Sequence, residues 1–140
     1  MMRIRNFQER IEACLLAARG SLETLLAFSP VRLGMASPPM KSGVYAFSEQ
    51  GAIVYVGEAS GSKGLRDRIL YKHLSGDEGH GLQRAFEAEY PDRKARRDFL
   101  KKSLHIQWVE ISDSLAASVV EKLAIEVLEP KYNKAVQLRT

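Results

Sequence analysis

Residues 43–57 of the chain read GVYAFSEQGAIVYVG: two runs rich in valine, isoleucine and aromatic residues, separated by a short polar segment that contains Gly51. These residue types favour strands, and two such runs joined by a few polar residues with a glycine are typical of a β-hairpin. We therefore predict a hairpin here, with Gly51 in a left-handed backbone conformation.

The register of this hairpin decides whether its two tyrosines meet. A three-residue loop that pairs Ser48 with Ala52 places Tyr45 directly opposite Tyr55, on one face of the sheet. Such a pair is commonly just packed aromatic surface. However, a glycine stands outside each tyrosine, where a backbone or a ligand can come close. The pattern leaves both interpretations open, a packed pair or the centre of a site.

The segments around the hairpin are mostly helical. Apolar residues at helical spacing predict a helix over residues 4–28, and the prolines of residues 29–42 predict a linker or strap. Downstream we expect a strand at 106–111 and helices at 65–74, 82–89, 92–103 and 115–128. The predicted fold class is α+β, a small three-stranded antiparallel sheet flanked by helices. We divide the chain into an N-terminal helix and strap, residues 1–42, and a main domain, residues 43–140.

Composition limits the classes of protein to consider. The chain has 140 residues, the size of one domain, with 45% hydrophobic and 27% charged residues, as in soluble globular proteins. Its net charge of +4 fits a nucleic-acid partner without requiring one. The single cysteine, Cys14, excludes an internal disulfide, and its apolar surroundings predict a place in the core. No apolar run reaches the ~20 residues of a membrane span, so we expect no membrane partner and a cytoplasmic location.

A basic helix follows the hairpin. Arg68 lies near its start, where free backbone N–H groups and the helix dipole favour a phosphate, and its guanidinium fork suits one. Lys72 shares the face of Arg68, whereas His73 is turned away by a further ~100°. Arg68 is either a solvated residue or a phosphate ligand, and His73 is either a proton carrier or an ordinary surface histidine.

The last predicted helix carries a carboxylate among apolar side chains. On a helical wheel Glu121 falls beside Ala117 and Leu128, whereas Lys122 points to solvent. A carboxylate placed against the core needs a partner, because an unpaired buried charge is costly. An arginine and a divalent metal ion such as Mg²⁺ both fit that requirement.

Together these segments resemble a known family. Four motifs occur in the order found in the GIY-YIG nuclease superfamily, over about two-thirds of the chain: GVY at 43–45, YVG at 55–57, LRDR at 65–68, and Glu121 before PKYN at 130–133. The resemblance implies a three-stranded antiparallel sheet flanked by helices. It also implies hydrolysis of a nucleic-acid phosphodiester with one divalent metal ion, Mg²⁺ or Mn²⁺.

The resemblance implies a role for each motif residue. Tyr45 matches the candidate general base that activates water, and Tyr55 matches the tyrosine that binds or orients the phosphate or the water. Arg68 matches the arginine that stabilises transition-state charge, Glu121 the metal ligand, and Asn133 the asparagine that supports the site. From its own context Asn133 also reads as a turn residue. The free pKa of tyrosine is near 10, so a base at this position needs a neighbouring cation.

The chain departs from the family pattern near the arginine. Glu58 follows the second motif, where a basic residue is frequent in the family. The loop from there to Arg68 is about three residues longer than in common members. Lys72 stands where many members have a histidine or a tyrosine. Tyr71, Lys72 and His73 are therefore the candidate helpers of the reaction.

DNA is the expected partner, and basic residues near the site are candidate contacts. Four of them share one face of the helix predicted at 92–103, although aspartates are interspersed, so a solvated charged face is the alternative. The candidate nucleic-acid contacts are Lys63, Arg66, Arg93, Arg96, Arg97 and Lys101. The N-terminal helix is a candidate surface for a homodimer or a partner protein. A DNA endonuclease is the leading interpretation, and a catalytically silent nucleic-acid-binding or protein-interaction module of the same fold is the alternative.

Overall fold

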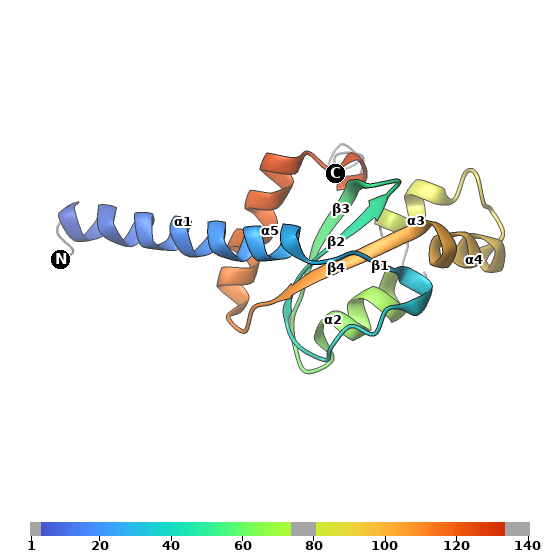
Figure 1. The fold of residues 1–140 in the computed structure, drawn as a ribbon, viewed down its shortest axis with the longest axis horizontal. Coiled ribbons are helices and arrows are strands. Elements are labelled where there is room, and N and C mark those ends of the chain that lie inside the picture. Colours follow the sequence, from blue (N-terminus) through green and yellow to red (C-terminus); the bar gives the residue numbers. More distant parts are fainter. Residues whose placement is uncertain (1–3, 74–80, 134–140) are drawn as a thin grey trace.

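The computed structural model describes residues 4–73 and 81–133, and for residues 4, 5, 72, 73 and 81 it describes the backbone alone. Figure 1 shows a central sheet with helices on both sides and α1 extending away from the rest. The elements in chain order are α1 (Ile4–Ala27), β1 (Val31–Arg32), the 3-10 helix η1 (Leu33–Met35), β2 (Gly43–Glu49), β3 (Ala52–Ala59), α2 (Gly64–Arg66), its π-helical continuation η2 (Asp67–His73), α3 (Gly81–Phe86), α4 (Arg93–Ser103), β4 (Leu104–Glu110) and α5 (Ser114–Leu128).

The sheet is antiparallel and has the strand order β1-β4-β2-β3. The predicted α+β class is confirmed, but the sheet has four strands rather than three. The additional strand comes from the proline-containing segment, where Val31 pairs with Ile106 of β4. A two-residue strand carries no periodicity, so the sequence pattern could not indicate it.

The predicted hairpin is present, but its predicted register is wrong by two residues. Tyr45 pairs with Gly57, and Phe47 pairs with Tyr55. The turn has two residues, Gln50 and Gly51, both with positive φ (52° and 84°), as the tight turns that match strand twist require. A bulge between Phe47 and Ser48 accommodates the difference. Because the error is an even number of residues, both tyrosines still lie on the same face.

Side chains of β2 alternate between two hydrophobic cores, one on each face of the sheet. Val44 and Ala46 pack in a core with residues of α1 and α5, whereas Tyr45 and Phe47 pack in a core with residues of α2, α3 and α4. Figure 1 shows the sheet between α5 and α2. Since β3 is an edge strand, side chains from helices on the two faces can approach each other around it.

The segment between η1 and β2 covers the start of the basic helix. The backbone N–H of Leu65 donates to the carbonyl of Lys41 at 2.8 Å, and that of Arg66 donates to the carbonyl of Pro39 at 3.0 Å. Gly64 has φ of +49°, and a Cβ there would overlap the Lys41 carbonyl. The prediction that this helix start offers free N–H groups to a phosphate is therefore wrong for these two amides.

Helix α1 has two parts with different surroundings. Its second half is buried against the body through Ala18, Leu22 and Leu25, and Gly20 does not interrupt it. Its first half extends beyond the body, so Cys14 is exposed and the prediction of a core cysteine is wrong. Within the described residues, no helix combines the length and the apolar character that crossing a membrane requires. The division of the chain at residue 42 stays a prediction.

Candidate active site

Tyr45 lies at the bottom of the candidate site. It is 1% exposed, and its ring stacks on that of Tyr55 with 6.5 Å between centroids and 29° between planes. The guanidinium of Arg68 hydrogen bonds with the Tyr45 hydroxyl. Gly57 lies directly across the strand pair, and a Cβ added to it would overlap the Tyr45 hydroxyl oxygen. The Tyr45 ring can therefore occupy this position only because Gly57 has no side chain.

Replacing Gly57 with alanine is expected to lower the free energy of unfolding by about 3 kcal/mol, because the methyl group and the Tyr45 ring cannot share the same volume. Urea unfolding followed by circular dichroism measures the change. Gly20→Ala is the matched control, since a Cβ there meets nothing within 4 Å and alanine favours the helix by about 1 kcal/mol. Equal effects of the two substitutions would contradict the close approach at Gly57.

The two phenols differ in burial and therefore in the state of their protons. Burial raises the pKa of Tyr45 far above its ordinary value, Tyr55 raises it further, and Arg68 opposes both. Burial also raises the pKa of the half-buried Tyr55, again opposed by Arg68. Both side chains are consequently neutral phenols at pH 7. Tyr45 can act as a base only where additional positive charge lowers its pKa.

Glu121 enters the site from α5. It is 9% exposed, in agreement with its predicted place among apolar side chains, and it lies near enough to both tyrosines to raise their pKa values. Its Oε1 atom accepts a 2.7 Å hydrogen bond from Nζ of Lys122. The prediction that Lys122 points to solvent is confirmed, since its side chain is 74% exposed, and its ammonium group contacts Glu121 as well. The carboxylate hydrogen bond raises the pKa of Lys122, which stays charged.

Tyr45, Tyr55, Arg68 and Glu121 come from both faces of the sheet and gather around the edge strand β3. Each tyrosine interacts electrostatically with both Arg68 and Glu121. The residues are up to 76 positions apart in the chain (121 − 45), so only tertiary structure can assemble them. The structure thus gathers two phenols, a guanidinium and a carboxylate in one place.

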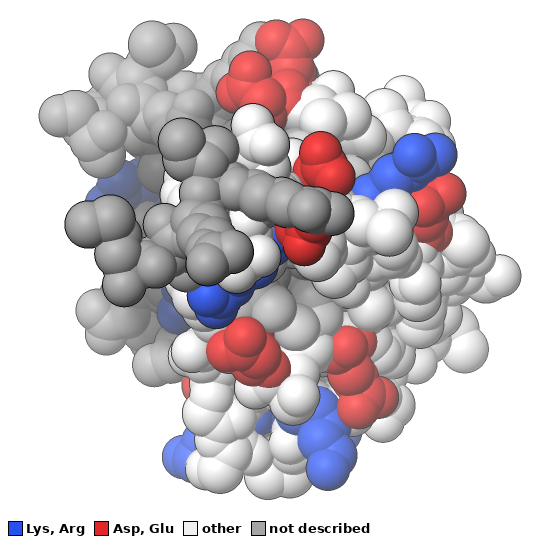
Figure 2. All heavy atoms as spheres, turned by 90° about the vertical axis from the view of Figure 1, so that its left-hand side faces the viewer, with Lys and Arg blue, Asp and Glu red and all other residues white. Residues whose placement is uncertain are grey.

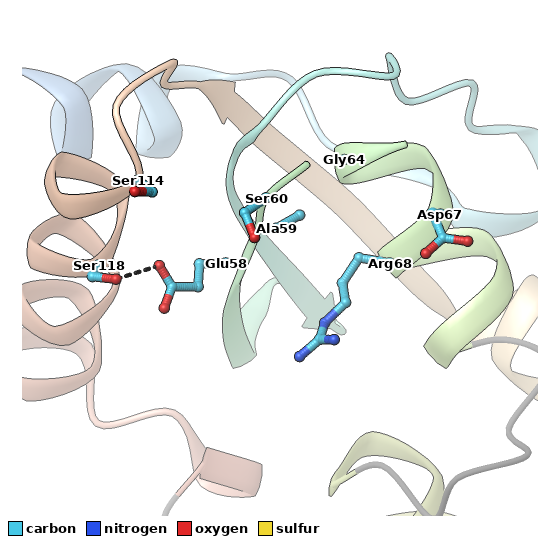
Figure 3. Close-up of a pocket in the computed structure, with 8 residues that line it drawn as sticks. All are labelled: Glu58, Ala59, Ser60, Gly64, Asp67, Arg68, Ser114 and Ser118. Atoms are coloured by element: carbon cyan, nitrogen blue, oxygen red, sulfur yellow. Dashed lines mark hydrogen bonds between the residues drawn. The ribbon is translucent and has the colours of Figure 1, made fainter. Parts of the chain in front are cut away.

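A polar pocket of about 290 Å³ opens beside this group. Figure 3 shows Arg68 extending into it from η2, and Glu58 extending from β3 toward α5, where the Ser118 hydroxyl donates a 2.7 Å hydrogen bond to its carboxylate. Groups of both charges line the pocket. This combination suits a ligand that brings both an anion and a cation, such as a phosphodiester with its metal ion.

Asn133 acts on the backbone of β3. Its Oδ1 accepts from the Val56 N–H at 2.7 Å, and its Nδ2 donates to the Val56 carbonyl at 2.9 Å. The asparagine side chain thereby occupies the free edge of β3 between Tyr55 and Gly57. It supports the position of the tyrosine through the backbone.

Of the three candidate helpers, the structure describes the side chain of Tyr71 alone. Tyr71 is 57% exposed and lines a separate hollow with Lys63 and Arg66. The side chains of Lys72 and His73 lie outside the described residues. A helper role for the three residues stays a prediction.

The predicted basic face of α4 is divided by burial. Arg96 is 7% exposed and donates to the side chain of Gln83 and to the carbonyl of Tyr90, so it is a structural residue and cannot contact DNA as placed here. Arg93 and Lys101 are exposed, whereas Arg97 is half-buried with its Nε atom enclosed. Figure 2 shows another face, on which acidic and basic side chains are intermingled without a continuous basic surface among the residues drawn in colour.

The oxygen ligands at the site fit a magnesium-type ion. Glu121 and Glu58 offer carboxylates, and residues 4–73 and 81–133 contain no group of three or more His, Cys, Asp or Glu side chains suited to hold a metal ion. Zinc requires such a set. Mg²⁺ instead uses one or two carboxylates and completes its shell with water and phosphate oxygens.

Comparisons with known proteins found similar solved structures. No protein-family model matches the chain, and no curated protein matches it. The GIY-YIG N-terminal endonuclease domain of UvrC from Thermotoga maritima, bound to magnesium as its catalytic divalent cation, is 21% identical over 72% of this chain and 90% of that chain, with a TM-score of 0.46. A point mutant of that domain, also bound to its catalytic cation, is 21% identical over 71% and 88%, with a TM-score of 0.46. At these identities and TM-scores the likeness carries no argument about this chain.

Two features of this site were not predicted from the sequence. The hydrogen bond between Ser118 and Glu58 spans 60 residues, and no local pattern indicates it. The contact of Lys122 with Glu121 joins neighbours in the chain, but adjacent helical residues do not face each other, so the wheel placed the lysine in solvent. The length and flexibility of the lysine stem were the signal available for it.

Proposed function

We propose that this chain is a divalent-metal-dependent DNA endonuclease that hydrolyses phosphodiester bonds with a water nucleophile. The single observation that carries the proposal is the meeting of Tyr45, Tyr55, Arg68 and Glu121 around β3. Metal-assisted phosphodiester hydrolysis needs an oriented water, a cation site and positive charge beside the phosphate oxygens. These side chains offer all three within one group.

Each residue has a role that its surroundings support. Arg68 is exposed at the pocket and holds the phosphate, stabilising the charge that develops on its oxygens. Tyr55, half-buried above Tyr45, orients the phosphate or the attacking water through its hydroxyl. Tyr45 would act in its ionised form: the phenol first loses its own proton to solvent, and its phenolate oxygen then takes the proton of the attacking water. Its hydrogen bond from Arg68 favours the ionised form that this step needs, and burial opposes it.

Glu121 is the proposed ligand of the divalent cation, with Glu58 as a second carboxylate nearby. When bound there, Mg²⁺ or Mn²⁺ supplies positive charge that polarises the phosphate and lowers the pKa of neighbouring groups. Asn133 acts as a positioning residue, because it holds the backbone of β3 beside Tyr55.

Nicking of supercoiled plasmid DNA tests the proposal. We expect conversion to the open-circular form in Mg²⁺ or Mn²⁺ and no conversion after EDTA removes the cation, with activity restored by excess Mg²⁺. DNA binding that weakens with salt but is never followed by cleavage would instead support the catalytically silent binding module. Branched, flapped, nicked and plain duplex DNA compared under the same conditions would identify the preferred substrate.

A further inference from the structure

The ammonium group of Lys122 lies at the site although its position on the helix points elsewhere. Adjacent residues on a helix do not face each other. The Glu121 side chain is 12% exposed and that of Lys122 is 74% exposed, yet Nζ lies 2.7 Å from Oε1 of the glutamate. The flexible lysine stem therefore folds back to place its charge on the buried carboxylate.

Glu58 extends this charge arrangement toward the pocket. Ser118, which holds the Glu58 carboxylate, precedes Lys122 by four residues and hence shares its face of α5. Lys122 interacts electrostatically with Glu58 and Tyr55 as well as with Glu121. One exposed ammonium group thus interacts with two carboxylates and a phenol.

Lys122 contacts one of the two carboxylate oxygens that Glu121 offers to a divalent cation. Two positive groups on one carboxylate repel each other, so a cation held by Glu121 favours displacement of the ammonium group. Glu58 gives the displaced group a second carboxylate close by. A substrate phosphate in the pocket would provide a further anionic partner on the same side of β3.

We propose that Lys122 competes with the divalent cation for Glu121 and moves to a substrate phosphate oxygen once the cation is bound. This inference rests on the nuclease function proposed above and adds a second positive side chain to it. Arg68 lines the pocket from η2, and Ser118 of α5 lines it from the other side. Lys122 follows Ser118 by one helical turn on the same face of α5, so its long side chain can approach a phosphate in the pocket from the side opposite Arg68. Glu58 keeps the lysine within reach between its two positions.

Two measurements on Lys122→Met test the two parts of the inference. Calorimetric titration with Mn²⁺ alone is expected to show about fivefold tighter binding than the wild-type protein, because the competing charge is removed. Cleavage of plasmid DNA at saturating Mg²⁺ is expected to fall about tenfold, because one phosphate contact is lost. Tighter metal binding with slower cleavage is a combination that general structural damage would not produce.

Three further variants complete the test. Lys122→Arg keeps the charge and should stay within about twofold of the wild-type Mn²⁺ affinity. Lys102→Met replaces an exposed lysine on α4 and should change neither measurement.

Mn²⁺ affinity in Lys122→Met that is unchanged or weaker overturns the competition, and unchanged cleavage at saturating cation overturns the transfer to phosphate. Glu121→Gln separates the failures: if it binds Mn²⁺ as the wild type does, the metal site of the proposed function is itself wrong.

Discussion

Glu121→Gln is expected to lower the rate of plasmid nicking in Mg²⁺ by about a thousandfold while leaving the fold intact. Glutamine has nearly the shape of glutamate and can still accept a hydrogen bond from Lys122, so the packing of α5 is kept. It has no charge, so it cannot hold a divalent cation as a carboxylate does. Initial rates on supercoiled plasmid, with circular dichroism to confirm folding, measure the effect.

The same helix provides the control. Glu126 is an exposed glutamate of α5, and Glu126→Gln should nick DNA at the wild-type rate. The two variants lose the same charge from the same helix, so a difference between them reports position alone. Nicking by Glu121→Gln at a near wild-type rate would remove Glu121 from the reaction.

Arg68→Ala is expected to slow cleavage by about a hundredfold or more, with little change in stability. The arginine is exposed, so its loss leaves no cavity in either core. It removes both the positive charge at the pocket and the hydrogen bond to Tyr45, and the pKa of Tyr45 should rise further. Single-turnover cleavage measures the rate, and urea unfolding measures the stability.

Two other variants show which property of Arg68 matters. Arg68→Lys keeps the charge but loses the planar fork, so partial recovery of the rate would assign the remainder to geometry. Arg84→Ala removes an exposed arginine from α3 and should leave the rate unchanged. If Arg68→Ala and Arg84→Ala behaved alike, the phosphate-binding role of Arg68 would be wrong.

The tyrosine pair shows how far local reasoning extends. Alternation along the two strands is a property of the backbone, so the sequence predicts that Tyr45 and Tyr55 share a face. The register depends on whether the turn has two or three residues and on the bulge between Phe47 and Ser48, and neither follows from the alternation of side chains. The tyrosines are consequently diagonal neighbours, and Gly57 rather than Tyr55 lies opposite Tyr45.

The basic helix α4 shows where spacing fails. Helical periodicity predicts which arginines share a face, but it does not say what that face contacts. Arg96 is buried because Gln83 and the carbonyl of Tyr90 happen to meet it, and both belong to other segments. A charged side chain with such hydrogen-bond partners can be buried, so the charge of Arg96 did not suffice to predict that it lies on the surface.

The sequence by itself determined the hairpin, the amphipathic α5 with its inward glutamate, and the order of the motif residues, because each follows from backbone periodicity within one segment. Only the tertiary structure decided the rest. Asn133 bonds Val56 across 77 residues, Ser118 bonds Glu58 across 60, and Lys41 covers the start of the basic helix. Such contacts depend on how segments distant in the chain pack together, and no local pattern of residues records that packing.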